Sequence, residues 1–306
     1  MLKYILKRLF ASFITLWVVV SLTFFMAHAI PGNPFTSDKK LPPSVEANLK
    51  AKFGLDKTLP AQYVAYMGSL LKGDLGPSIT YEGRTVNDII AYSFPTSAKL
   101  GGVAVLFALI VGIYLGVLAA LHQSKWQDGF SMVIATIGVT IPSFVMATLL
   151  IYVFAIKLMW LPAVGFDGPL NYIMPVIALG GFPMAFITRY SRSMLVDVLK
   201  QDYVRTARAK GLSENIVTYK HALRNSLVPI ITYLGPLVAG VLTGSFVVET
   251  IFGIPGLGRE FINSISNRDY TTILGVTVFY CAILISCNFI VDIIYVIVDP
   301  RIRLDV

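Results

Sequence analysis

The chain has 306 residues, of which 56% are hydrophobic and only 14% are charged, and its formal net charge is +8 at pH 7. Soluble domains carry about 25% charged residues, so this composition excludes a soluble globule, a disordered tail and a nucleic-acid-binding module. The basic residues lie between long apolar runs, and we interpret them as signals of membrane orientation. The sequence therefore indicates an all-α polytopic membrane protein.

Six uncharged stretches are long enough to cross a bilayer as helices, since a hydrocarbon core about 30 Å thick needs roughly 20 residues. The runs are continuous rather than alternating, which favours helices over the strands of a membrane barrel. The third stretch is longer than necessary, and a tilt or a kink at Pro142 would accommodate it. The predicted spans are Leu9–Ile30, Leu100–Leu121, Gly129–Ile156, Pro169–Thr188, Ser226–Val248 and Tyr270–Val291.

The first span also has the outline of a signal peptide. Lys3, Lys7 and Arg8 form a basic start, and Ala27-His28-Ala29 resembles a cleavage site with small residues. The apolar run of this segment is about 20 residues long, whereas the apolar region of a signal peptide has about 7–15. The length favours a retained first helix, and residues 1–30 are read as the N-terminus with this helix.

Residues 31–98 form a long segment with nearly balanced charges, which we expect to lie outside the cytoplasm. Turn residues divide it into three predicted helices. These run from Leu41 to Gly54, from Pro60 to Lys72, and from Val86 to Ser93 with a stop at Pro95. The segment is interpreted as a cap on the membrane face, as a docking surface for an extracytoplasmic partner, or as both.

The segment 192–225, between the fourth and fifth spans, is rich in Lys and Arg. Read as a helix, it places Val204, Ala207 and Gly211 on one face of small side chains, which another surface could approach closely. Gly211 is suited to end this helix, and Ser213 to cap a second short one with Glu214 in its first turn. The segment is either a protruding helical handle or an ordinary basic loop.

Two arginines, Arg205 and Arg208, flank the small face and could pair with acidic groups of a partner protein. Basic residues also gather at the N-terminus and in the tail 299–306. With six spans, all three basic segments fall on one side of the membrane, which should be the cytoplasm. The sequence therefore predicts that both termini are cytoplasmic.

The sequence from Arg205 to Gly211, R-T-A-R-A-K-G, resembles the signature loop of binding-protein-dependent ABC importer permeases. The general pattern is E-A-A, three residues and G; here Arg and Thr replace the first two residues, as in the peptide-permease branch. The resemblance implies that this loop couples the permease to an ATPase. The implied coupling residues are Val204, Arg205, Thr206, Ala207, Arg208, Ala209, Lys210 and Gly211.

Further similarity to oligopeptide and dipeptide permeases extends over nearly the whole chain. The matching segments are Pro31–Phe35, Lys72–Ser78, Glu249–Gly258, Asn267–Tyr270 and Asp299–Arg301. The resemblance implies a type I importer fold in a bacterial cytoplasmic (inner) membrane, with a transport domain at about 99–298. It also implies a second homologous permease subunit, two cytoplasmic ATPases that use ATP and Mg, and an extracytoplasmic peptide-binding protein.

This chain has no G-x-x-x-x-G-K-[ST] phosphate loop, so we expect ATP to be hydrolysed by other chains and no cofactor to be bound here. A permease for nickel, glutathione or another small solute would share these motifs and remains an alternative. A proton-coupled carrier is a second alternative, although Asp292 lies near a span end rather than deep inside. The scattered His and Cys residues predict no metal site.

Two glycine pairs, Gly112 with Gly116 and Gly240 with Gly244, have the G-x-x-x-G spacing that allows helices to pack closely. These faces are interpreted as contacts within this subunit or with the second permease subunit.

Overall fold

The structure is a computed structural model that describes residues 2–29, 51, 54 and 56–298. The predicted helix from Leu41 to Gly54 and the tail 299–306 fall almost entirely outside these residues. The described part is helical, with no strand. Its elements are α1 (Leu2–Ala29), α3 (Leu59–Leu71), α4 (Val86–Leu121), α5 (Trp126–Thr140), α6 (Ser143–Leu150), η1 (Ile151–Lys157), α7 (Leu170–Leu199), α8 (Asp202–Ala209), η2 (Ile216–Ala222), α9 (Leu223–Ser226), α10 (Val228–Ile251), α11 (Leu257–Ser266) and α12 (Tyr270–Val298).

Five of the six predicted spans are continuous helices in the described part of the chain: α1, α4, α7, α10 and α12. The third predicted span is a bent pair, in which α5 and the segment Ser143–Lys157 meet at 109°. Pro142 lies at the bend, because proline has no N–H to continue the helix and restricts Ile141 to extended backbone. The kink expected at this proline is confirmed.

The bent pair still leads from one end of the bundle to the other. α5 begins beside the last turns of α7, where Asp128 binds Arg192. After η1 the chain reaches the opposite end, where the N–H of Gly165 donates to the carbonyl of Phe252, just beyond α10. The pair therefore counts as one crossing, which gives six in the part of the chain that the structure describes.

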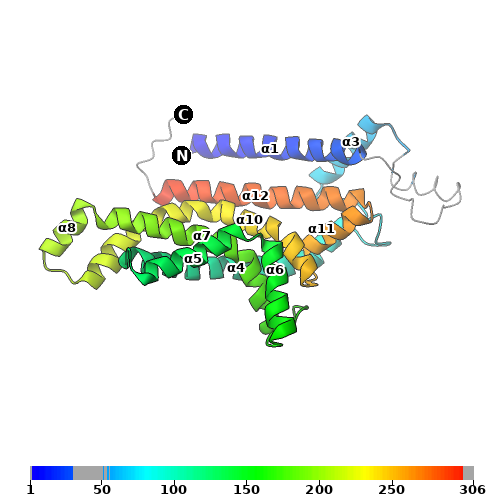
Figure 1. Cartoon of the computed structure of the whole chain (residues 1–306). Coiled ribbons are helices and arrows are strands. Elements are labelled where there is room, and N and C mark those ends of the chain that lie inside the picture. Colours follow the sequence, from blue (N-terminus) through cyan, green and yellow to red (C-terminus); the bar gives the residue numbers. More distant parts are fainter. Residues whose placement is uncertain (1, 30–50, 52–53, 55, 299–306) are drawn as a thin grey trace.

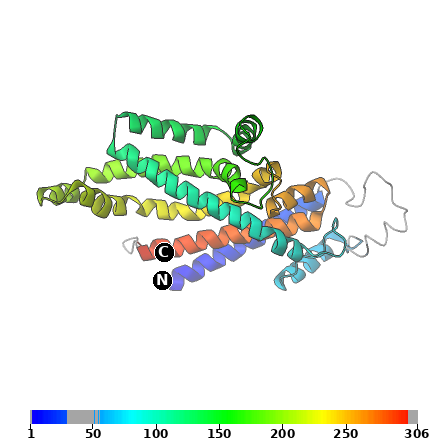
Figure 2. The same ribbon diagram turned by 90° about the horizontal axis from the view of Figure 1, so that it is seen from below.

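The long helices α1, α12, α10, α7 and α4 lie side by side, with α8 at one end and α3 and α11 at the other (Figure 1). We call these the handle end and the α11 end. The first residues of α1 and the last described residues of α12 both lie at the handle end. α6 projects from the side of the bundle and is seen nearly end-on in the second view (Figure 2).

Helix α4 is much longer than the sequence predicted. It begins at Val86 with a capping box between Thr85 and Asp88, and it continues through Pro95 for 36 residues, or roughly 54 Å. The predicted helix end at Pro95 is wrong. The boundary between residues 98 and 99, where the transport domain is predicted to begin, lies inside α4. Proline removes one N–H, but the buried side chains before it pack against α10, α11 and α12 and hold the helix together.

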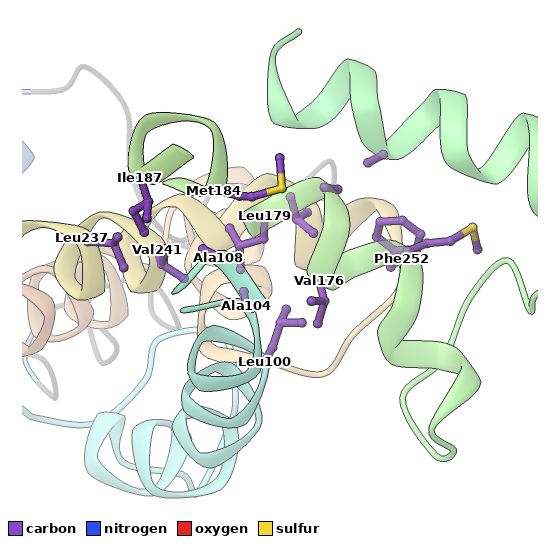
Figure 3. Close-up of a cluster of buried hydrophobic side chains, with 14 of the residues drawn as sticks. Leu100, Ala104, Ala108, Val176, Leu179, Met184, Ile187, Leu237, Val241 and Phe252 are labelled. Atoms are coloured by element: carbon purple, nitrogen blue, oxygen red, sulfur yellow. The ribbon is translucent and has the colours of Figure 1, made fainter. Parts of the chain in front are cut away.

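The core is formed by α4, α7 and α10. Where α4 and α7 approach most closely, α4 carries glycine. Gly112 lies against Met184 and Ile187, and Gly116 lies against Thr188 and Ser191. The interpretation of this glycine pair as a contact within the subunit is confirmed. Figure 3 shows apolar side chains of this core, namely Leu100, Ala104, Ala108, Val176, Leu179, Met184, Ile187, Leu237, Val241 and Phe252.

Helix α1 packs along α12 as part of the bundle. Phe24 and Ala27 are buried with Leu274, and Arg8 forms an ion pair with Asp292 at 3.0 Å. Ten large apolar side chains of α1 are exposed, as expected for a helix that faces lipid. Asp292 therefore joins two spans, which agrees with a structural role for this carboxylate.

Candidate functional site

The segment between α7 and α10 folds into a hairpin of two short helices, α8 and the continuous pair η2–α9. We call residues 202–226 the handle. Gly211 has φ +77°, the left-handed conformation that ends α8. The N–H of Gly211 donates to Arg208 and that of Leu212 to Ala207, at 2.9 and 3.3 Å. The predicted helix end at Gly211 and the handle itself are confirmed.

The small face of α8 is not a free surface, contrary to our interpretation of the sequence. Val204 is fully buried and Ala207 is 8% exposed, because both pack against Val217 of η2 and the last residues of α7. The helical spacing placed these two residues on one face correctly. That face is covered by the second helix of the handle, since an isolated hairpin must bury its own apolar side chains.

Polar contacts join the two helices of the handle at two further places. Nε and Nη2 of Arg208 donate to the carboxylate of Glu214 at 2.8 and 3.2 Å, close to the turn. Nδ2 of Asn225 donates to the hydroxyl of Tyr203 at 2.9 Å. Arg208 therefore binds an acidic group of its own handle. We had expected it to pair with an acidic group of a partner protein.

The outward surface of α8 is polar and basic. Tyr203, Arg205, Thr206, Ala209 and Lys210 are all exposed, and Arg205 forms an ion pair with the exposed Asp202 at 3.6 Å. Such a pair of solvated charges contributes little to stability. Of the eight residues that the sequence singled out, Val204 and Ala207 shape the handle, Gly211 and Arg208 form its turn, and Arg205, Thr206, Ala209 and Lys210 are available to a partner.

The handle is firmly attached to the bundle at its base. Ala222 of η2 and Leu195 of α7 are fully buried in a cluster with Val117 and Ala120 of α4. One turn before Leu195 on α7, Nε and Nη2 of Arg192 donate to both carboxylate oxygens of Asp128 at 2.6 and 2.7 Å. The handle is thus connected through packed side chains to α4 and α7, and through this bidentate ion pair to α5.

At the α11 end, a buried carboxylate holds the connection between α10 and α11. Glu249 has no exposed surface, and its Oε2 accepts the N–H of Arg259 in the first turn of α11 at 3.1 Å. A Cβ at Gly256 or Gly258 would collide with this side chain. Sequence reasoning ended the fifth span at Val248 and missed Glu249, although the motif Glu249–Gly258 already contained the carboxylate and both glycines.

A second buried carboxylate brings two of the sequence motifs together. Asp269, from Asn267–Tyr270, accepts the hydroxyl of Ser78, from Lys72–Ser78, and also the N–H of Thr80 at 3.1 Å. It further accepts the N–H and hydroxyl of Thr272 at 3.0 and 2.8 Å. The segment before α4 is thereby fastened to the corner between α11 and α12.

Replacing Ser78 with alanine is expected to lower the free energy of unfolding by about 1.5–3 kcal/mol, because a buried charged acceptor loses a donor. The measurement is the thermal unfolding midpoint of the purified subunit in detergent. Thr80→Ala is the matched control, since Thr80 donates to the same carboxylate through its backbone. Equal midpoints for the two variants would contradict the role given to the Ser78 hydroxyl.

Comparison with known proteins gives the arrangement its context. The family described as "Binding-protein-dependent transport system inner membrane component" matches residues 112–304, and the N-terminal part described for the same systems matches residues 1–105. The chain belongs to this family. It is a multi-pass protein of the cytoplasmic membrane and a permease subunit of a binding-protein-dependent ABC importer, which works in a complex with other ABC components.

Similar proteins of this family match over almost their full length. The chain is 47% identical to the dipeptide transport system permease protein DppB of Bacillus subtilis, with 99% of both chains covered. It is 46% identical to the oligopeptide transport system permease protein OppB of Haemophilus influenzae and 45% identical to OppB of Escherichia coli strain K12. Each match covers 99% of this chain and 100% of the relative.

A solved structure shares the fold. The crystal structure of an amino acid ABC transporter with histidines matches with a TM-score of 0.55 at 17% identity, and the match covers 68% of this chain and 94% of that chain. The predicted fold, an all-α ABC importer permease with six spans, is confirmed. Among the described residues, no group of three His, Cys, Asp or Glu side chains could hold a metal ion.

Proposed function

We propose that this permease imports peptides, forming half of a pathway whose other half is a second, homologous permease subunit. The observation that supports this most is the full-length similarity to relatives named as dipeptide and oligopeptide permeases. Peptides would be delivered by an extracytoplasmic binding protein. The segment 31–98 and the α11 end would face that protein, with the transport domain at 99–298 between them and the cytoplasm.

The handle is the proposed contact with one of the two cytoplasmic ATPase subunits. It projects from the bundle, its outer surface carries Arg205 and Lys210, and its base is packed into α4 and α7. A push on such a rigid hairpin would move both helices together, and the Asp128–Arg192 pair would carry the motion to α5. Rocking of packed helices between two arrangements would then open the pathway to alternate sides.

The energy would come from hydrolysis of ATP, which those separate subunits would bind together with Mg, since this sequence has no phosphate loop. In this arrangement both termini lie in the cytoplasm, on the same side as the handle. The handle-end position of α1 and α12 supports this orientation.

The experiment is uptake into proteoliposomes that contain both permease subunits, the two ATPases and the binding protein. We expect trialanine to accumulate only when ATP is supplied to the ATPase side. Uptake of a nickel chelate or glutathione in place of di- to pentapeptides would contradict the peptide assignment. Uptake driven by a proton gradient without ATP would contradict the ATPase coupling.

A further inference from the structure

Arg189 is an exposed cation on the wall of the bundle, on the side where α5 and α7 meet. Its Nη2 donates to the hydroxyl of Thr136 on α5 at 2.9 Å, and both side chains are exposed. The predicted fourth span ends at Thr188, directly before Arg189. In the structure α7 continues to Leu199, ten residues beyond Arg189.

Neighbouring helices give the depth of this side chain in the membrane. Thr136 lies ten residues from the start of α5 at Trp126, roughly 15 Å along the helix axis. Next to Arg189, Thr188 lies against Gly116, five residues or roughly 7.5 Å before the last residue of α4, Leu121. Gly116 and Thr136 both belong to helices that are apolar enough to cross a membrane, so the guanidinium lies beside membrane-spanning sequence on α4 and α5 and is bonded to Thr136.

A charge at this depth needs water or a protein around it, because lipid tails do not solvate it. In the described part of the chain, no Asp or Glu side chain pairs with Arg189. By contrast, Arg192, one turn away on the same helix, binds Asp128 with two hydrogen bonds. Arg189 is thus a cation whose complementary anion is not part of the described chain.

The surface next to Arg189 is aromatic. Phe182, Phe186 and Arg189 follow one another at helical spacing on one face of α7, and Phe182 is 53% exposed. The ring of Phe186 stacks on Tyr233 of α10, with 4.2 Å between the ring centroids. The face built from α5, α7 and α10 therefore offers one cation beside a broad aromatic area, which suits a carboxylate followed by side chains of mixed character.

We propose that Arg189 lines the aqueous pathway and binds the C-terminal carboxylate of a peptide in transit. A guanidinium and a carboxylate form two parallel hydrogen bonds, and every peptide with an unblocked C-terminus carries this group whatever its sequence. Phe182 and Phe186 then contact the side chains, which vary. The assignment of the carboxylate rests on the proposed peptide function, whereas the location in water does not.

The first measurement tests the location without any peptide. Arg189→Cys is made in a chain with Cys281 and Cys287 replaced by serine, and is labelled in the assembled complex with the charged, membrane-impermeant reagent methanethiosulfonate ethylsulfonate. Phe13→Cys is the control, since Phe13 is exposed on the lipid-facing side of α1. We expect at least tenfold faster labelling at position 189. Equal rates, or protection by a contact with the second permease subunit, would overturn the proposal.

The second measurement tests the charge. Trialanine uptake by the Arg189→Cys complex is expected to fall at least tenfold, and to recover at least half after reaction with methanethiosulfonate ethylammonium, which restores a positive charge. The same complex should lose most of the wild-type preference for trialanine over its C-terminal amide. Because the binding protein is the same in both complexes, such a change would come from position 189. If the wild-type complex imports trialanine and the variant does so equally well, the carboxylate assignment is wrong. No uptake by the wild type would instead contradict the proposed function.

Discussion

Replacing Gly116 with valine is expected to separate α4 from α7 and to prevent the subunit from accumulating in the membrane. A Cβ at this position would lie 2.5 Å from Cβ of Ser191 and 2.7 Å from the carbonyl oxygen of Thr188. The second contact is with backbone, which no rotamer change relieves. Overpacking in a core typically costs about 1–3 kcal/mol, and a valine here should reach or exceed that range.

The matched control is Gly102→Val on the same helix. A Cβ at Gly102 meets nothing within 4 Å, so valine there changes the composition of α4 without forcing the helices apart. The amount of each variant in isolated membranes and its thermal unfolding midpoint in detergent are compared with wild type. A Gly116 variant that matches the Gly102 variant in both measurements would show that α4 and α7 are not packed as described.

Reversing the charge of Arg205 and Lys210 to glutamate is expected to reduce ATP-driven uptake at least tenfold while the subunit stays folded. Both side chains are exposed on the outer surface of α8. Exposed substitutions usually change the free energy of unfolding by less than about 0.5 kcal/mol, so a loss of transport would come from the contact with the ATPases. Uptake and co-purification of the ATPases are measured together.

The contrast is Val204→Asp, which places a charge in the buried centre of the handle. This variant should lower the unfolding midpoint as well as transport, because an unpaired buried charge is costly. Ala207→Trp belongs to the same class, since Ala207 is enclosed rather than open to a partner. Normal co-purification and uptake with Arg205 and Lys210 both reversed would rule out the outer surface of α8 as the ATPase contact.

The spans could be predicted from the sequence because an apolar run of about 20 residues has few other uses. Their ends could not, since α4 and α7 continue into polar sequence where hydrophobicity gives no signal. At Pro95 a local rule predicted a helix end, but packing of Val86, Ile89 and Ile90 holds the helix through it. Tertiary contacts of this kind are absent from any single stretch of sequence.

The functional residues show the same limit. Spacing alone placed Val204 and Ala207 on one face of a helix, but it could not tell whether that face is covered by Val217 or by another protein. Arg189 falls just outside the predicted fourth span, which ends at Thr188 because the uncharged run stops there. Its depth became visible only through Thr136, which is 53 residues earlier in the chain.

The bend at Pro142 sets the segment Ser143–Lys157 at a steep angle to α5, so a rotation of α5 about its axis would displace this arm sideways. The arm Ser143–Lys157 stands at 109° to α5 and is 15 residues long, roughly 20 Å. Each degree of twist of α5 about its own axis would sweep the tip of such an arm by about a third of an ångström. Because Arg192 binds α5 to α7 and Ala147 of the arm is buried among side chains of α7 and α10, such a twist would move the arm against the helices on which it packs.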